Sequence, residues 1–229
     1  MEFGNRNLCV LFTWGDTVVY LTETIFATWV IMAVLIAFTI LVRIRMKSFR
    51  SIPTGFQNVI ETAVEMMMHF VHDTVGAELA HWDGYFFGLF LFIIASNYSG
   101  MFCLRPPTSD IATTGALALT VFAMIHGLGI ARRKGKYFKS YIEPVAIFLP
   151  INLIGELAKP LSLAFRLFGN ILSGVIIAGL LYNMLPLFLR FLLPDIAHAY
   201  FDVVVGAIQA YVFTTLSMTF IKQMSSEEV

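Results

Sequence analysis

Long apolar runs divide the chain into segments that are long enough to cross a membrane. Residues 24–42 form an uninterrupted apolar run, and about 20 such residues span a hydrocarbon core of about 30 Å as a helix. Further runs cover residues 84–104, 111–130, 142–181 and 196–222. A chain in lipid satisfies its own backbone hydrogen bonds most simply as helices. The pattern therefore predicts one membrane domain, an all-α polytopic membrane protein with about five crossings.

Residues 53–76 show a different pattern, with apolar positions on one helix face only. Phe56, Val59 and Ile60 begin an i, i+3, i+4 series, and Gln57 and Glu61 lie on the other side. This spacing predicts an amphipathic helix that lies along the membrane interface without crossing. On its polar face Glu65, His69 and His72 have a spacing that metal ligands also use, but we favour a solvated polar face and expect no metal.

The run over residues 142–181 is too long for an upright helix. At about 1.5 Å per residue it would extend about 60 Å, twice the hydrocarbon thickness. Either Pro150 and Pro160 break it, because proline lacks the backbone N–H that a helix needs, or it lies strongly tilted.

Clusters of basic residues set the expected orientation. Arg43, Arg45, Lys47 and Arg50 follow the first run, and Arg132, Arg133, Lys134, Lys136 and Lys139 follow the third. Because positive loops stay in the cytoplasm, residues 1–23 are expected outside and the C-terminus inside.

Composition supports a membrane protein and argues against several other classes. The chain is 58% hydrophobic and 13% charged with zero net charge, and its mean hydropathy is +0.79. A neutral chain offers no basic surface for nucleic acid. Cys9 and Cys103 lack metal-type spacing, the start lacks a signal-peptide pattern, and no glycine-rich phosphate loop is present. We expect no cofactor.

A polar stripe runs along the long fourth run. Stepping by three or four from Arg166 reaches Gly155, Lys159 and Ser162 in one direction and Asn170 and Ser173 in the other. A charge at mid-membrane costs about 3 kcal/mol, so such a residue usually faces a cavity or a partner and is functional. The alternative is an arginine that pairs with a carboxylate only to hold helices together.

The last run carries a second polar stripe, formed by Asp195, His198, Asp202, Gly206 and Gln209, with Ser217 as a further candidate. The polar residues of both runs then fall into two sets. Asn170, Ser173, Asp202 and Gln209 lie toward the external side, and Glu156, Lys159 and Ser162 lie toward the cytoplasm. No row of polar residues crosses the whole membrane. This division suggests two aqueous half-paths, each open to one side, that meet at Arg166.

The segments "KPLSLAFRLFGN" (159–170), "AIQAYVFTTLS" (207–217) and "SSEE" (225–228) resemble subunit a of the bacterial F-type ATP synthase. The resemblance implies that Arg166 is indispensable for coupled ion movement. Asn170 matches the asparagine of the family motif, and Gln209 matches a glutamine that neighbours the arginine in family members. Ser162 and Lys159 match the residues before that arginine, and Asp202 matches the external relay. Val175 departs from the family, because many relatives carry Glu or His there.

The same resemblance implies the partners and the location. They are a rotor ring of small hairpin subunits that each carry one buried carboxylate, the peripheral-stalk subunit b, the rest of the ATP synthase and membrane lipid. The last two helices would be long and strongly tilted to pack along the ring. The implied function is ion translocation, with H⁺ as the expected ion, across the bacterial plasma membrane.

Two other functions remain open at this point. A proton-coupled secondary transporter would need matched inverted repeats, which the runs do not show. An intramembrane serine protease would use Ser173 as nucleophile with His198 or His126 as base, but Ser173 lacks the usual nucleophile context.

Overall fold

The structure is a computed structural model. It describes residues 7–14, 17–50, 52–76, 81–102, 104–134, 137, 146–190 and 192–226. Some features discussed above lie outside the described residues. They are the first six residues of the N-terminal segment, Cys103, Lys136 and Lys139 of the second basic cluster, residues 142–145 of the fourth run, and residues 227–229.

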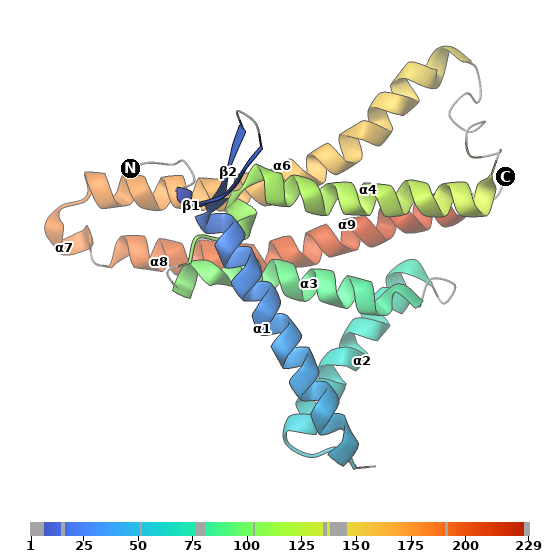
Figure 1. Cartoon of the computed structure of the whole chain (residues 1–229), viewed down its shortest axis with the longest axis horizontal. Coiled ribbons are helices and arrows are strands. Elements are labelled where there is room, and N and C mark those ends of the chain that lie inside the picture. Colours follow the sequence, from blue (N-terminus) through green and yellow to red (C-terminus); the bar gives the residue numbers. More distant parts are fainter. Residues whose placement is uncertain are drawn as a thin grey trace.

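Four helices lie side by side and form the body of the molecule (Figure 1). They are α3 (Asp83–Tyr98), α4 (Ile111–Arg133), α6 (Leu149–Met184) and α9 (Gly206–Ser226). Their shared core contains fully buried apolar side chains from each helix, including Phe86, Val121, Leu167 and Met218. Short 3-10 turns connect the helices at Met46–Ser48, Ser99–Phe102, Pro107–Ser109 and Ala146–Phe148.

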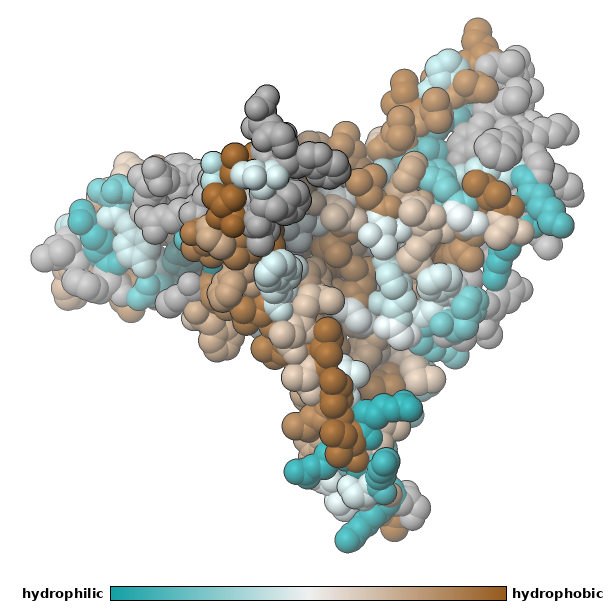
Figure 2. All heavy atoms as spheres, viewed as in Figure 1, coloured by the Kyte–Doolittle hydropathy of each residue, from teal (hydrophilic) through white to brown (hydrophobic). Residues whose placement is uncertain are grey.

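Helices α1 (Glu23–Arg45) and α2 (Phe56–Val75) form a V that projects from this body (Figure 1). Only 11% of the most apolar stretch within Glu23–Ser48 is buried, and Val34, Ile36 and Ile40 are more than half exposed. Figure 2 shows a hydrophobic column along this projection. A surface this apolar is suited to contact with lipid or with another membrane protein, because its exposure to water would be unfavourable.

Among the described residues, five helical segments are long and apolar enough to cross a membrane: Glu23–Ser48, Asp83–Phe102, Ile111–Arg132, Leu149–Met184 and Phe188–Met224. They correspond to the five apolar runs. The sequence prediction of an all-α polytopic membrane protein is therefore confirmed. Helix α2 lies within the range predicted for the amphipathic helix, with Met67, Val71 and Val75 of its apolar face buried.

A β-hairpin precedes α1 and was not predicted. Strands β1 (Asn7–Trp14) and β2 (Thr17–Thr22) pair antiparallel, with Asn7 opposite Thr22 and Trp14 opposite Thr17. Thr22 then caps α1, because its side chain accepts a hydrogen bond from the Ile25 backbone N–H. We call the end of the bundle that carries this hairpin the hairpin end, and the end at which α4 reaches Arg132 the basic end.

From Leu149 onward the fourth run is one continuous helix, α6, which bends. Pro150 lies in the first turn of α6, where a missing N–H costs nothing, but Pro160 lies inside the helix. Figure 1 shows that the first part of α6 lies at an angle to the rest. A proline inside a helix removes one i to i−4 hydrogen bond and crowds the preceding turn, so it bends the axis. A break at Pro160 is therefore wrong, whereas Pro150 lies where the helix begins.

The last run is less regular than its pattern predicted. Helices α7 (Leu187–Arg190) and α8 (Leu193–Ala199) lead into a π-helical segment at Tyr200–Val205, which continues into α9. A π segment shifts the phase of every later side chain. Ser217 is fully buried, and its hydroxyl donates to the Phe213 carbonyl 2.7 Å away. It therefore does not belong to an exposed polar stripe.

One buried amide ties three elements together near the π segment. Asn97 of α3 is fully buried; its Nδ2 donates to the Gly206 carbonyl (2.9 Å) and its Oδ1 accepts from the Thr108 hydroxyl (2.7 Å). A similar contact holds α1, because the buried Thr24 hydroxyl donates to Asp110, the N-cap of α4 (2.9 Å). These hydrogen bonds stabilise one alignment of the helices, because another alignment would leave buried polar groups without partners, which is costly.

We expect Asn97→Ala to destabilise the protein by about 1–3 kcal/mol, because the Thr108 hydroxyl and the Gly206 carbonyl lose their partner inside the core. The measurement is the thermal stability and yield of the purified protein in detergent. Asn58→Ala, at an exposed position of α2, is the matched control. Equal stability of the two variants would contradict this account of the Asn97 contacts.

Candidate functional site

Arg166 lies on the outer face of α6. Leu163, Ala164 and Leu167 of the same helix are buried against the bundle, whereas Arg166 is exposed. Within the part of the chain that the structure describes, its guanidinium makes no hydrogen bond and no ion pair. The alternative in which a carboxylate of this chain neutralises Arg166 to hold helices together therefore finds no support among the described residues.

The other stripe residues of α6 share this outward face. Ser162 and Ser173 are exposed and Asn170 is half-buried. The Ser173 hydroxyl donates to the carbonyl of Gly169, 2.6 Å away in its own helix. It is therefore not paired with a histidine, as a nucleophilic serine would be.

A cavity of about 480 Å³ opens at the hairpin end, between the start of α1, the Gly100–Pro106 segment and the last run. Its polar lining consists of Glu23, Arg105, His198 and Asp202. Its apolar lining consists of Leu8, Phe26, Leu104, Pro106 and Val175. Asp202 is half-buried, and His198 lines the same cavity. Four ionisable groups around one cavity in an otherwise apolar region indicate a site with access to water.

The missing side chain of Gly100 leaves room for the carboxylate of Asp202. A Cβ atom at residue 100 would lie 2.6 Å from Asp202 Oδ2 and 3.2 Å from its Cγ. Any larger residue would therefore displace the carboxylate. The 3-10 turn Ser99–Phe102 thus determines where the acidic group of the π segment lies.

The structure does not join all the predicted residues into one cluster. Gln209 is half-buried on α9, which packs against α6, but no hydrogen bond links it to Arg166 or Asn170 within the described residues. Asp195 accepts a hydrogen bond from the Tyr182 hydroxyl (2.9 Å), which connects the end of α6 to α8. Among the described residues, no hydrogen bond therefore joins residues 166, 202 and 209 to one another.

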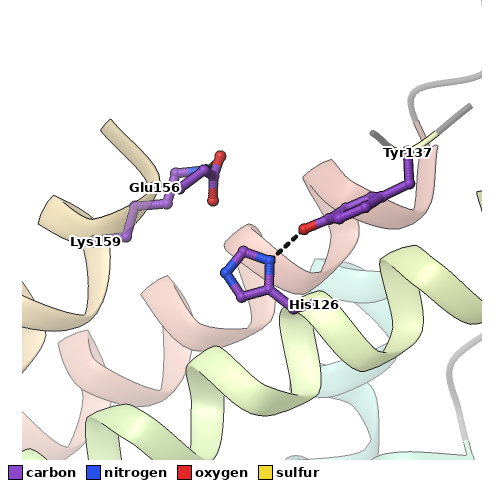
Figure 3. Close-up of polar contacts among 4 residues, drawn as sticks. All are labelled: His126, Tyr137, Glu156 and Lys159. Carbon is purple, nitrogen blue, oxygen red and sulfur yellow. Dashed lines mark hydrogen bonds and ion pairs between the residues drawn. The ribbon is translucent and has the colours of Figure 1, made fainter. Parts of the chain in front are cut away.

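At the basic end, Glu156 and Lys159 form an ion pair one helical turn apart. Lys159 Nζ lies 2.6 Å from Glu156 Oε1, and the two side chains are 21% and 13% exposed respectively. Lys159 Nζ also lies 5.6 Å from the centroid of the Phe220 ring of α9. The sequence patterns missed His126 and Tyr137, which are hydrogen-bonded to each other beside this pair (Figure 3). His126 had been considered only as a protease base.

Another cavity, with a volume of about 560 Å³, lies between α1 and α2. It contains neither Arg166 nor any member of the two polar sets. On α2, Glu65 and His69 are 74% exposed, and His72 instead contacts Asp83 of α3 at 3.2 Å. This face behaves as a solvated surface, so we do not place the functional site there.

The fold and this arrangement define a multi-pass helical membrane protein whose longest helix presents a charge that no described residue neutralises. Residues 25–222 match the family model described as ATP synthase A chain. Because the match covers most of the chain, the protein belongs to this family and acts in the membrane sector of an ATP synthase. The resemblance drawn from the "RLFGN" region is thereby confirmed.

If the hairpin-end cavity holds water, a cysteine at residue 202 should be accessible to reagents. In a variant without Cys9 and Cys103, we expect Asp202→Cys to react with a small hydrophilic thiol reagent about tenfold faster than Ala210→Cys, which is fully buried. The measurement is the labelling rate of the assembled complex in membrane vesicles. Equal slow labelling at both positions would mean that the cavity is dry.

Proposed function

We propose that this protein moves ions, with H⁺ as the expected ion, through two offset half-paths against a rotor ring, and so couples ion flow to ring rotation and ATP synthesis. The observation that supports the proposal is that the Arg166 side chain is exposed and has no partner among the described residues. An exposed guanidinium without a partner among the described residues, in the middle of a 36-residue apolar helix, is costly unless another subunit supplies its partner.

The ring carboxylate implied by the family fits this requirement. Alone in lipid it stays protonated, because burial disfavours the charged form. Close to Arg166, an attraction of about 4 kcal/mol at about 4 Å and an effective dielectric constant of about 20 favours the ionised form. The proton then leaves the carboxylate near the arginine and returns as the carboxylate moves away.

The polar residues supply the two routes for that proton. Toward the hairpin end the route uses Asn170, Ser173, Gln209 and Asp202. Toward the basic end it uses Ser162, Lys159 and Glu156. The charge of Arg166 between them opposes a direct leak, since a proton would have to pass a positive group. The membrane potential adds about 2.3 kcal/mol per charge per 100 mV and drives the direction of turning.

The proposal includes an orientation and a set of partners. The basic end and the cluster of Arg43, Arg45 and Lys47 face the cytoplasm, and the hairpin end faces outward. The membrane is the bacterial plasma membrane, and the partners are the rotor ring and the peripheral-stalk subunit b. The exposed apolar surface of α1 and the outer face of α6 offer area for such neighbours.

We expect Arg166→Ala and Arg166→Leu to abolish ion-driven ATP synthesis, because no positive group would remain to ionise the passing carboxylate. Arg166→Lys should not restore full activity, since an ammonium group lacks the planar fork of donors of a guanidinium. The measurement is ATP synthesis by energised membrane vesicles, normalised to the amount of assembled complex. Normal synthesis in Arg166→Ala would refute the proposed function.

We expect Asp202→Asn to lower proton flux by about tenfold or more, because an amide cannot take up and release a proton at the hairpin-end cavity. The measurement is passive proton conduction through the membrane sector after removal of the catalytic head. Asp73→Asn, at an exposed position of α2, is the matched control and should conduct normally. An unchanged flux in Asp202→Asn would remove this residue from the pathway.

A further inference from the structure

Four polar side chains gather at the basic end between α4 and α6, and we call them the His126 cluster. They are His126 of α4, Tyr137, and Glu156 and Lys159 of α6. Figure 3 shows the imidazole ring between the Tyr137 hydroxyl and the Glu156–Lys159 pair. Lys159 Nζ lies 2.6 Å from Glu156 Oε1, and the Tyr137 hydroxyl is hydrogen-bonded to His126 Nδ1. The cluster is therefore one electrostatic unit that joins two helices.

Two atoms of this unit are buried without a hydrogen-bond partner among the described residues. Glu156 uses Oε1 to bind Lys159, but its Oε2 has no partner. His126 uses Nδ1 to bind the Tyr137 hydroxyl, but its Nε2 has no partner. Buried polar atoms without partners are rare and costly. Two such atoms in one cluster are better explained by protons that pass through the site than by a fixed contact that only holds two helices together.

The imidazole is held firmly in this position. Its ring makes an edge contact with Phe122, with the ring centroids 3.8 Å apart and the planes at 79°. Tyr137 is only 3% exposed and packs on Gly129, where a Cβ atom would lie 2.5 Å from Tyr137 Cε2. The glycine therefore permits the contact that brings the hydroxyl to His126 Nδ1.

We propose that His126 is a proton-carrying residue of the basic-end half-path and passes protons between Glu156 and Tyr137. This inference rests on the proposed function. A neutral imidazole has one N–H and one bare nitrogen, so it can accept a proton on one side and release another on the opposite side.

The step balances without any other reactant. A proton from Glu156 Oε2 reaches His126 Nε2, directly or through one bridging water. His126 Nδ1 then releases its proton to the Tyr137 oxygen, and the hydroxyl proton of Tyr137 passes onward to the cytoplasm. Lys159 holds the other carboxylate oxygen and so leaves Oε2 available. Each transfer leaves the imidazole with its proton on Nε2 and a bare Nδ1, so the two tautomers must exchange through water before the next proton enters. The reverse order of the same transfers serves the opposite direction.

The test compares proton conduction through the assembled membrane sector in vesicles stripped of the catalytic head, with a potassium diffusion potential as the driving force. We expect His126→Gln to lower conduction by about tenfold, because glutamine forms hydrogen bonds but carries no proton at neutral pH. His69→Gln, a histidine with a 74% exposed side chain, is the matched control and should conduct normally.

A second measurement separates proton transfer from a structural role. We expect added imidazole to restore at least part of the conduction of His126→Ala and pyrrole, a ring of similar size without a basic nitrogen, to restore none. Rescue by both compounds equally, or by neither in a variant that assembles normally, would show that His126 only fills space. Tyr137→Phe keeps the packing on Gly129 and should also conduct less than the unmodified protein.

The outcomes also separate this inference from the proposed function. If Arg166→Ala loses ATP synthesis while His126→Gln conducts normally, only the role of His126 is wrong. If Arg166→Ala makes ATP normally, the proposed function fails, whatever the His126 variants do.

Discussion

An apolar helix of this chain carries a charge that no described residue neutralises. The free-energy cost of that charge is the main constraint on how the protein is arranged. Arg166 is exposed on α6, and within the described residues it has no partner. A membrane protein tolerates this only where a cavity or another subunit receives the charge. The outer face of α6 is therefore best understood as half of an interface. Its opposite face, with Leu163, Ala164 and Leu167, attaches the helix to the bundle.

Two groups of ionisable side chains lie at opposite ends of the bundle, and the local packing supports each of them. At the hairpin end, the Asn97 contacts and the π segment fix the backbone next to Asp202, and Gly100 leaves space for its carboxylate. At the basic end, the bend of α6 at Pro160 comes just after the Glu156–Lys159 pair. Each end thus has its own rigid support. A separation of this kind is what two offset half-paths require under the proposed function.

The sequence predicted those features that depend on local pattern. Run length predicted the five spans, and periodicity predicted the amphipathic α2. The π segment was not predictable, because it depends on contacts between α3 and the last run rather than on periodicity. His126 and Tyr137 meet across a chain reversal. Neither a helix nor a strand brings the side chains of residues 11 positions apart into contact, so the contact between His126 and Tyr137 is visible only in the tertiary structure.

The hairpin-end cavity gives a physical reason why an apolar Val175 is tolerable. The family resemblance led us to expect an ionisable group at this position, and Val175 does line the same cavity as Asp202. His198, Glu23 and Arg105 line it as well. Proton uptake under the proposed function requires ionisable groups around a wet space, and not one particular helix position. Because α1, the Gly100–Pro106 segment and the last run all contribute to that space, an apolar residue on α6 leaves the cavity polar. Among the described residues of the two long final helices, Asp202 is the one carboxylate that lines it.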